Sequence, residues 1–204
     1  MTQTNWWWVR HAPVTETQGR IYGSTDPNCD TDDPESYAGL HRMLPQDAFW
    51  VTSHLKRTKQ TAAAIAAAGG RSIDPREEPD LCEQNFGDWH GMTHNEVYAL
   101  PSAHRFWLAP ATHCPPGGES FADLCVRVSR VIHRLTAQWA GRDIIAVAHG
   151  GTIRAALAVA LNLKPEAALG FATENISVTR LDHFTGDDGH PETWRVAWSN
   201  RLPK

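Results

Sequence analysis

Four basic side chains follow apolar runs of this chain, and their types suit the binding and attack of an anion. A guanidinium binds anions through charge-assisted hydrogen bonds, and an imidazole can act as a nucleophile. Runs that are apolar on both faces indicate buried parallel strands, and ligands bind beyond the carboxyl ends of such strands. The residues are Arg10 and His11 after run 6–9, Arg57 after run 48–51, and His149 after run 144–148. Their convergence predicts a site for a doubly charged anion such as phosphate.

Two of these positions coincide with expected helix starts. Ser53 is the predicted N-cap of a helix that places Arg57 in its first turn and ends at a glycine pair after residue 68. Gly150 follows His149, and its missing side chain leaves the first amides of a second helix open to a ligand. Both helix N-termini would add positive potential to the anion site.

A phosphoryl transfer also needs a proton donor, and the loop 81–91 offers one. Glu83 stands there among apolar and aromatic residues. Desolvation in such surroundings favours the protonated carboxyl that a general acid requires. Asp80 and Asp88 compete for this role by residue type alone, so all three carboxylates stay candidates at this point.

With these motifs in their order, the sequence resembles the histidine phosphatase superfamily in its phosphoglycerate-mutase-like branch, which includes α-ribazole phosphatases. The likeness covers nearly the whole chain. The motifs that carry it are Arg10-His11-Ala12, the second arginine motif Ser53 to Thr58, the acid loop with Glu83 and Phe86 to Gly91, and Ala148-His149-Gly150-Gly151. Further matches are Gly19 to Gly23, Pro116 to Ser120 and Glu174 to Ser177.

The resemblance implies a mechanism without metal or cofactor. His11 is expected to attack phosphorus and form a phosphohistidine, while Arg10, Arg57 and a protonated His149 hold the nonbridging oxygens. Glu83 is expected to protonate the departing oxygen and later to activate water. The residues expected to bind phosphate are Arg10, Arg57, His149, Gly150 and Thr17.

Two positions depart from the family pattern. Ala12 replaces the usual glycine after the nucleophile, which the chain tolerates if the backbone there is not left-handed. Thr17 stands six residues after His11, where many relatives carry a phosphate-binding asparagine. Its hydroxyl can still donate a hydrogen bond.

The expected fold is an α/β three-layer sandwich, with a mostly parallel central sheet flanked by helices, as in phosphoglycerate mutases. We expect a single domain over residues 1–204 with a cap-like insertion at about 90–116 that selects the substrate. Predicted central strands cover 6–11, 49–53 and 143–149, with further strands toward an edge of the sheet at 175–181 and 193–198. Ser120 and Asp123 predict a capping box for a helix from Phe121 to about Trp139, with Arg127 away from its apolar face. Residues 26–36 read as an exposed loop near the site.

Composition favours a cytoplasmic protein that acts on small molecules. The formal net charge of −4 and pI near 6.2 favour neither nucleic acid nor an anionic membrane as partner. The amino-terminal residues resemble no signal peptide, and the four cysteines lack a paired spacing, so we expect reduced thiols. The expected partner is a small phosphomonoester. The sequence leaves a homodimer as an alternative to a monomer.

Several functions compete on this evidence. A metal-independent, histidine acid phosphatase-type phosphomonoesterase comes first, because the chain lacks the extra length of cofactor-dependent mutases. A cofactor-dependent phosphoglycerate mutase shares every catalytic residue, and a non-catalytic phosphate-binding protein would not need His11 and Glu83. A metal hydrolase built on His90 and His94 is a weaker alternative. Trp89, Phe106 and Trp107 are candidates for a surface that stacks on a ring-bearing leaving group.

Overall fold

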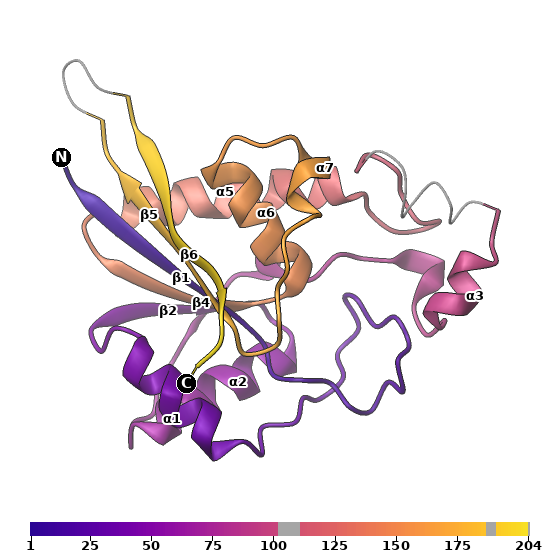
Figure 1. The fold of residues 1–204 in the computed structure, drawn as a ribbon, viewed down its shortest axis with the longest axis horizontal. Helices are drawn as coiled ribbons and strands as arrows, with labels where there is room; N and C mark the ends of the chain where they lie inside the picture. The colour runs from indigo at the N-terminus through magenta and orange to yellow at the C-terminus, as the bar shows by residue number, and fades with distance from the viewer. Residues whose placement is uncertain (102–110, 187–190, 204) are drawn as a thin grey trace.

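The computed structural model describes residues 1–101, 111–186 and 191–203, and a six-stranded sheet forms its centre. The sheet order is β3-β2-β4-β1-β5-β6, and helices lie on both faces (Figure 1). The strands are β1 (Gln3–Arg10), β2 (Ala48–Thr52), β3 (Arg76–Glu77), β4 (Asp143–Ala148), β5 (Val178–Phe184) and β6 (Thr193–Arg201). The predicted three-layer α/β/α sandwich is therefore confirmed.

The pairing register brings the carboxyl ends of three parallel strands to one edge. β1 pairs with β4 so that Arg10 lies opposite Ala148, and β2 pairs with β4 so that Thr52 lies opposite Val147. Strands β5 and β6 run antiparallel and complete the far side of the sheet. The mostly parallel sheet was predicted, although β5 begins three residues later than residue 175 and β3 was missed because it pairs over only two residues.

The tryptophan run of β1 is apolar on both faces because each face has its own helical layer. Trp6 and Trp8 pack with helix α5 (Phe121–Gln138) and helix α6 (Gly150–Ala160). Trp7 and Val9 pack on the opposite face with helix α1 (Pro34–Met43) and helix α2 (Lys56–Ala68). Figure 1 shows the two layers on either side of the strands.

The sequence predicted the boundaries of α5 and the carboxyl end of α2, which stops at Ala68 before Gly69, whereas the amino-terminal ends of α1 and α2 differ from the prediction. The capping box of Ser120 and Asp123 is present at the start of α5. The predicted exposed loop 26–36 is shorter than expected, because Asp33 caps α1 and the helix begins at Pro34. The remaining helical segments are η1 (Pro79–Leu81), η2 (Gly87–Trp89), α3 (His94–Tyr98) and α7 (Pro165–Ala168).

The segment expected to form a cap departs from the sheet layers. α3 lies to one side of the sandwich (Figure 1), and Val97 on this helix packs in a small separate cluster with Ile21 and Trp89. Residues 102–110 of the segment lie outside the described residues.

Among the helices of the described residues, none is long and apolar enough to span a membrane. All four cysteines are free, as predicted.

Candidate active site

The edge where β1, β2 and β4 end gathers the predicted basic residues. The rings of His11 and His149 lie 5.2 Å apart between centroids, and the His11 backbone N–H donates to the Ala148 carbonyl at 2.9 Å. Arg57 enters from the first turn of α2, as predicted. His11, Arg57 and His149 are at most 1 % exposed, so their polar atoms are sheltered from water.

His11 is prepared as a nucleophile by one hydrogen bond and by burial. Its Nδ1 lies 2.7 Å from the Ala12 carbonyl oxygen, which can only accept, so Nδ1 carries the proton and Nε2 carries the lone pair. Burial, together with the Arg57 and Arg10 charges, lowers the pKa of His11 to about 3, although the bond to Ala12 acts in the other direction. The imidazole is therefore neutral at pH 7, as nucleophilic attack requires.

Alanine fits in the place of the family's glycine after the nucleophile. Ala12 is fully buried, and its φ is not among the positive values of the described chain. Its N–H donates to Thr61 Oγ1 at 2.9 Å, which fastens the nucleophile loop to α2. The side-chain amide of Asn175 fixes the other side of this loop through the His11 carbonyl at 2.8 Å.

Three buried nitrogen atoms at this edge lack a hydrogen-bond partner among the described residues. Arg57 donates to the carbonyls of Thr25 and Gly23 at 2.7 and 2.6 Å, but its Nε has no acceptor. Arg10 donates through Nη1 to the Thr173 carbonyl, and its Nε is also without an acceptor. The third atom is His149 Nδ1. Buried donors normally find partners, so this arrangement fits an anion that binds between the three residues.

The expected protonated state of His149 is wrong for the free site. Full burial and the positive potential of Arg57 and its neighbours lower the pKa of His149 well below its ordinary value. Nε2 lies 2.9 Å from the Ser53 hydroxyl, which can donate to it and leave the proton on Nδ1. His149 thus offers a neutral N–H donor toward the anion rather than a fixed positive charge.

Ser53 is not the N-cap of α2, contrary to the sequence prediction. Leu55 occupies the cap position, and the first helical amide, at Lys56, donates to the Asp26 carboxylate at 2.7 Å. Ser53 Oγ is engaged instead with His149 and with the Thr58 hydroxyl at 3.1 Å. Its role is therefore to orient His149, which a local sequence pattern does not reveal.

Glu83 is the carboxylate that the fold brings to this edge. Its oxygens accept from the backbone N–H of Gly151, in the first turn of α6, at 3.2 and 3.3 Å. Asp80 and Asp88 are exposed, and neither is hydrogen-bonded to α6 in the described residues. Among the three candidates of the acid loop, the geometry favours Glu83.

A network that the sequence analysis missed holds the acid loop in place. Arg127 donates to the carbonyls of Asp80, Cys82 and Glu83 at 2.6, 2.8 and 3.2 Å. It also forms a two-pronged ion pair with Glu119, at 3.0 and 2.6 Å. Glu119 belongs to the motif matched at 116–120, and this match was the only sequence signal for the network. Helical periodicity placed Arg127 correctly off the apolar face but could not show which carbonyls it meets.

The last two predicted phosphate ligands differ in their positions. Gly150 opens α6 beside Arg10 and is buried. Thr17 lies in a turn that is closed by a hydrogen bond from the Arg20 N–H to the Thr17 carbonyl. With Tyr22 and His90, it lines a cavity of about 510 Å³. Tyr22 links this cavity to the site, because its ring centroid is 6.4 Å from that of His11.

Two further predictions change with the structure. Trp89 is 2 % exposed and belongs to the small cluster beside α3, so it does not offer a stacking surface. Phe106 and Trp107 lie outside the described residues.

His90 and His94, the pair considered for a metal site, do not share a helix, because His90 follows η2 and His94 begins α3. His90 Nε2 also accepts from the Phe86 N–H at 3.2 Å.

A model of the histidine phosphatase superfamily (branch 1) matches residues 6–197, which include the whole site. The chain belongs to the histidine phosphatase superfamily. This histidine phosphatase is 35 % identical over 198 residues to the glucosyl-3-phosphoglycerate phosphatase of Mycolicibacterium vanbaalenii, with 90 % of this chain and 86 % of the relative covered. These findings confirm the expected class, a phosphatase of a small phosphorylated metabolite.

Solved structures and a mutase relative extend the comparison. The complex of a mycobacterial glucosyl-3-phosphoglycerate phosphatase with inorganic phosphate superposes with a TM-score of 0.80 at 26 % identity, and covers 100 % of this chain and 99 % of that chain. The 2,3-bisphosphoglycerate-dependent phosphoglycerate mutase of Cytophaga hutchinsonii is 34 % identical over 137 residues, which is 64 % of this chain and 63 % of the mutase. The phosphatase relative thus matches over more of the chain than the mutase.

Proposed function

We propose that this histidine phosphatase is a metal-independent phosphomonoesterase that works through a phosphohistidine on His11, in the manner of histidine acid phosphatases. The observation that carries the proposal is the neutral, buried His11 beside three unpaired donors, Arg10 Nε, Arg57 Nε and His149 Nδ1. A nucleophile and an anion cradle at one sheet edge suit attack on a bound phosphoryl group.

In the first step, Nε2 of His11 attacks phosphorus in line with the leaving oxygen. The P–N bond forms as the P–O bond to the alcohol breaks, and Glu83 donates a proton to the departing alkoxide. Arg10 and Arg57 donate to the nonbridging oxygens throughout and stabilise their charge. The dianion raises the pKa of His149 relative to the free site, because an opposite charge favours the protonated imidazole.

In the second step, water attacks the phosphohistidine. Glu83, now a carboxylate, accepts a proton from this water as the P–O bond forms and the P–N bond breaks. Inorganic phosphate leaves, and His11 returns to its neutral state. A mutase would use the same residues but transfer the phosphoryl group to a second hydroxyl, so the fate of the phosphate separates the two functions.

The substrate is proposed to be a small phosphorylated metabolite, with glucosyl-3-phosphoglycerate as the first compound to test because of the relative's name. The segment at about 90–116 is proposed as the cap that selects it. Its first residue, His90, lines the cavity that reaches Tyr22 beside the nucleophile, which supports this role.

Phosphate release across a panel of phosphomonoesters, with and without chelator, tests the proposal. The panel should include glucosyl-3-phosphoglycerate, 3-phosphoglycerate and α-ribazole phosphate. Acid-quench mass spectrometry during turnover should find an acid-labile phosphate on His11, and His11→Asn should lose both the label and activity. Robust turnover by His11→Asn would overturn the proposal, and phosphate transfer without net release would favour the mutase.

A further inference from the structure

An acidic cavity lies beside the loop that carries the nucleophile. Its walls come from that loop, from the segment before α1, from α1 and from the segment before β5. The lining residues are Pro13, Asp30, Asp32, Asp33, Tyr37 and Ile176. The cavity has a volume of about 280 Å³, which is near the lower limit for pockets that bind small molecules. The phosphoryl transfer proposed above uses none of these residues.

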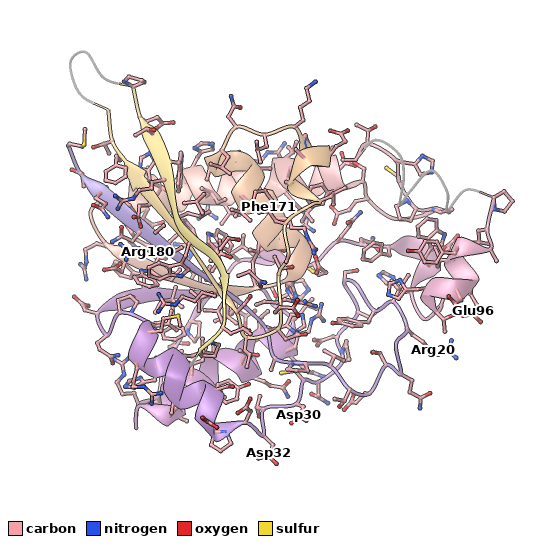
Figure 2. The ribbon with its side chains drawn as sticks, viewed as in Figure 1. Arg20, Asp30, Asp32, Glu96, Phe171 and Arg180 are labelled. Carbon is pink, nitrogen blue, oxygen red and sulfur yellow. The ribbon has the colours of Figure 1, made fainter. Side chains whose placement is uncertain are left out.

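Three carboxylates at the rim of this cavity carry negative charge that no described cation pairs with. Figure 2 shows two of them, Asp30 and Asp32, on the segment that leads into α1. These two and Asp33 are exposed, and none forms an ion pair among the described residues. Asp30 Oδ1 accepts from the Asp32 N–H at 2.9 Å, and Asp33 Oδ1 accepts from the Ser36 N–H at 3.1 Å. The rim is therefore ordered by its own hydrogen bonds and remains anionic.

The hydroxyl of Tyr37 is a buried polar group without a partner at the same cavity. Tyr37 is 3 % exposed, and its hydroxyl has no hydrogen-bond partner among the described residues. Burial, with the nearby Cys29, Asp33 and Asp30, raises the pKa of Tyr37, so the hydroxyl keeps its proton in a negative potential. A buried hydroxyl normally has a partner, and its oxygen can accept from a donor that enters the cavity.

The arrangement suits an ammonium ion better than a metal ion. Within the part of the chain that the structure describes, no three Asp, Glu, His or Cys side chains are placed to share a metal ion. A primary ammonium does not need such convergence, because its three N–H donors diverge and can reach separate acceptors. Pro13 and Ile176 also give the cavity apolar walls that a short alkyl chain can contact.

We propose that this cavity binds a small primary alkylammonium ion. The ammonium group donates to the Tyr37 hydroxyl oxygen and to the carboxylates of Asp30 and Asp33, which lie near that hydroxyl. The alkyl chain packs against Pro13 and Ile176.

The proposed site adjoins the nucleophile through two backbone hydrogen bonds. The Asp30 N–H donates at 2.8 Å to the carbonyl of Pro13, two residues after His11. On the opposite wall, the Ile176 N–H donates at 3.0 Å to the carbonyl of Arg10. A bound amine contacts both of these segments and should therefore stabilise the folded enzyme.

NMR of labelled tyrosines tests the site without turnover, so the result is independent of the proposed function. The chain has three tyrosines, and labelling with ¹³C at Cζ gives three signals. Tyr37→Phe assigns one signal by its loss, and Tyr98→Phe and Tyr22→Phe assign the others. Butylammonium chloride, at constant ionic strength and pH 7.5, should move the Tyr37 signal to saturation with a Kd on the order of 1 mM. The other two signals should not move, and the neutral 1-butanol should leave all three unchanged.

Matched variants test the two carboxylates. Asp30→Asn and Asp33→Asn each remove one charge but keep the Oδ1 that accepts a backbone N–H, and asparagine also caps helices well. Each should weaken butylammonium binding by roughly 3- to 10-fold. The control Asp74→Asn removes a charge from another exposed position and should leave the affinity unchanged.

Several outcomes would overturn the proposed site. They are a Tyr37 signal that stays fixed, equal movement of all three signals, and equal weakening by Asp74→Asn. A Tyr37 signal that responds as strongly to magnesium or potassium chloride would also overturn it, because the site would then bind metal ions. As an independent measurement, butylammonium should raise the melting temperature of the wild type more than that of the double variant Asp30→Asn/Asp33→Asn. Equal shifts in both proteins would contradict the proposal.

Discussion

The carboxylate of Glu83 accepts hydrogen bonds from the backbone N–H of Gly151 across 68 residues of sequence, at 3.2 Å to Oε1 and 3.3 Å to Oε2. This contact joins the acid loop to the first turn of α6, directly after His149. The proton donor and two of the residues expected to hold phosphate, His149 and Gly150, therefore meet at the same helix start. Neither group can shift without altering the distance between them.

Replacing Glu83 separates proton donation from phosphate binding. Glu83→Gln should lower kcat with alkyl phosphates by roughly 100-fold or more, because the alkoxide then leaves without a proton. The loss with p-nitrophenyl phosphate should be much smaller, since nitrophenolate needs little protonation. Steady-state kinetics on both substrates checks this expectation, and equal losses would indicate that Glu83 has a structural role.

Arg127 should act as a positioning residue for the general acid. Arg127→Gln removes the donors to the carbonyls of Asp80, Cys82 and Glu83 and the pair with Glu119, so we expect the backbone that carries Glu83 to be held less firmly. We expect kcat for alkyl phosphates to fall at least about 10-fold, with a smaller effect on p-nitrophenyl phosphate. Arg130→Gln on the same helix is the matched control, and uniform losses on both substrates would contradict this positioning role.

Burial of a neutral His11 should cost stability in acid. Its pKa is about 3 in the folded protein against 6.5 as the ordinary value, so the unfolded chain binds the proton first as pH falls below 6.5. At pH 5 this difference amounts to about 2 kcal/mol of lost unfolding free energy, relative to pH 7.5. Urea unfolding at pH 7.5 and at pH 5 measures this loss of unfolding free energy. The loss should be about 2 kcal/mol smaller in His11→Asn than in the wild type.

The exposed residue His133 on α5 provides the control for this measurement. His133→Asn should keep the wild-type difference between pH 7.5 and pH 5. An unchanged difference in His11→Asn would show that the His11 imidazole is not held neutral.

Vanadate and chelators test whether the protein's own hydrogen-bond donors, without a metal ion, stabilise the transferred group. The proposed site stabilises the transferred group with Arg10, Arg57 and His149, so EDTA should leave activity unchanged. Vanadate adopts the five-coordinate geometry of in-line transfer and should inhibit more tightly than phosphate. Initial rates with each addition check both points. Activity lost on chelation and restored by zinc or magnesium would revive the metal alternative at His90 and His94.

The basic residues of the site could be found from the sequence because each follows a strand that its own composition reveals. Trp6 to Val9 are apolar on both faces, and a parallel strand of this type fixes where the next side chains lie. The protonation state of His149 could not be found in this way, because it depends on burial and on charges from distant segments. Ser53 shows the same limit, since its local pattern suits a helix cap while its hydroxyl meets His149 across 96 residues.

The partners of the acid loop were hidden for a related reason. A helical pattern assigns Arg127 to a polar face, but it cannot distinguish a face in solvent from a face against the carbonyls of another loop. The motif around Glu119 matched the family pattern, but the match did not indicate which residue Glu119 contacts. Trp89 was misjudged because an aromatic residue beside glycines suits both a ligand surface and a small core.

Ala12, next to the nucleophile, is fully buried and packs in the same cluster as Val9, Leu40 and Ile65. We therefore expect the loop that carries the nucleophile to open only together with this core cluster. Hydrogen exchange at the Ala12 amide, which is bonded to Thr61, should proceed only through global unfolding. On heating, the enzyme should keep its full activity until the sheet itself melts, so inactivation and loss of structure should share one midpoint.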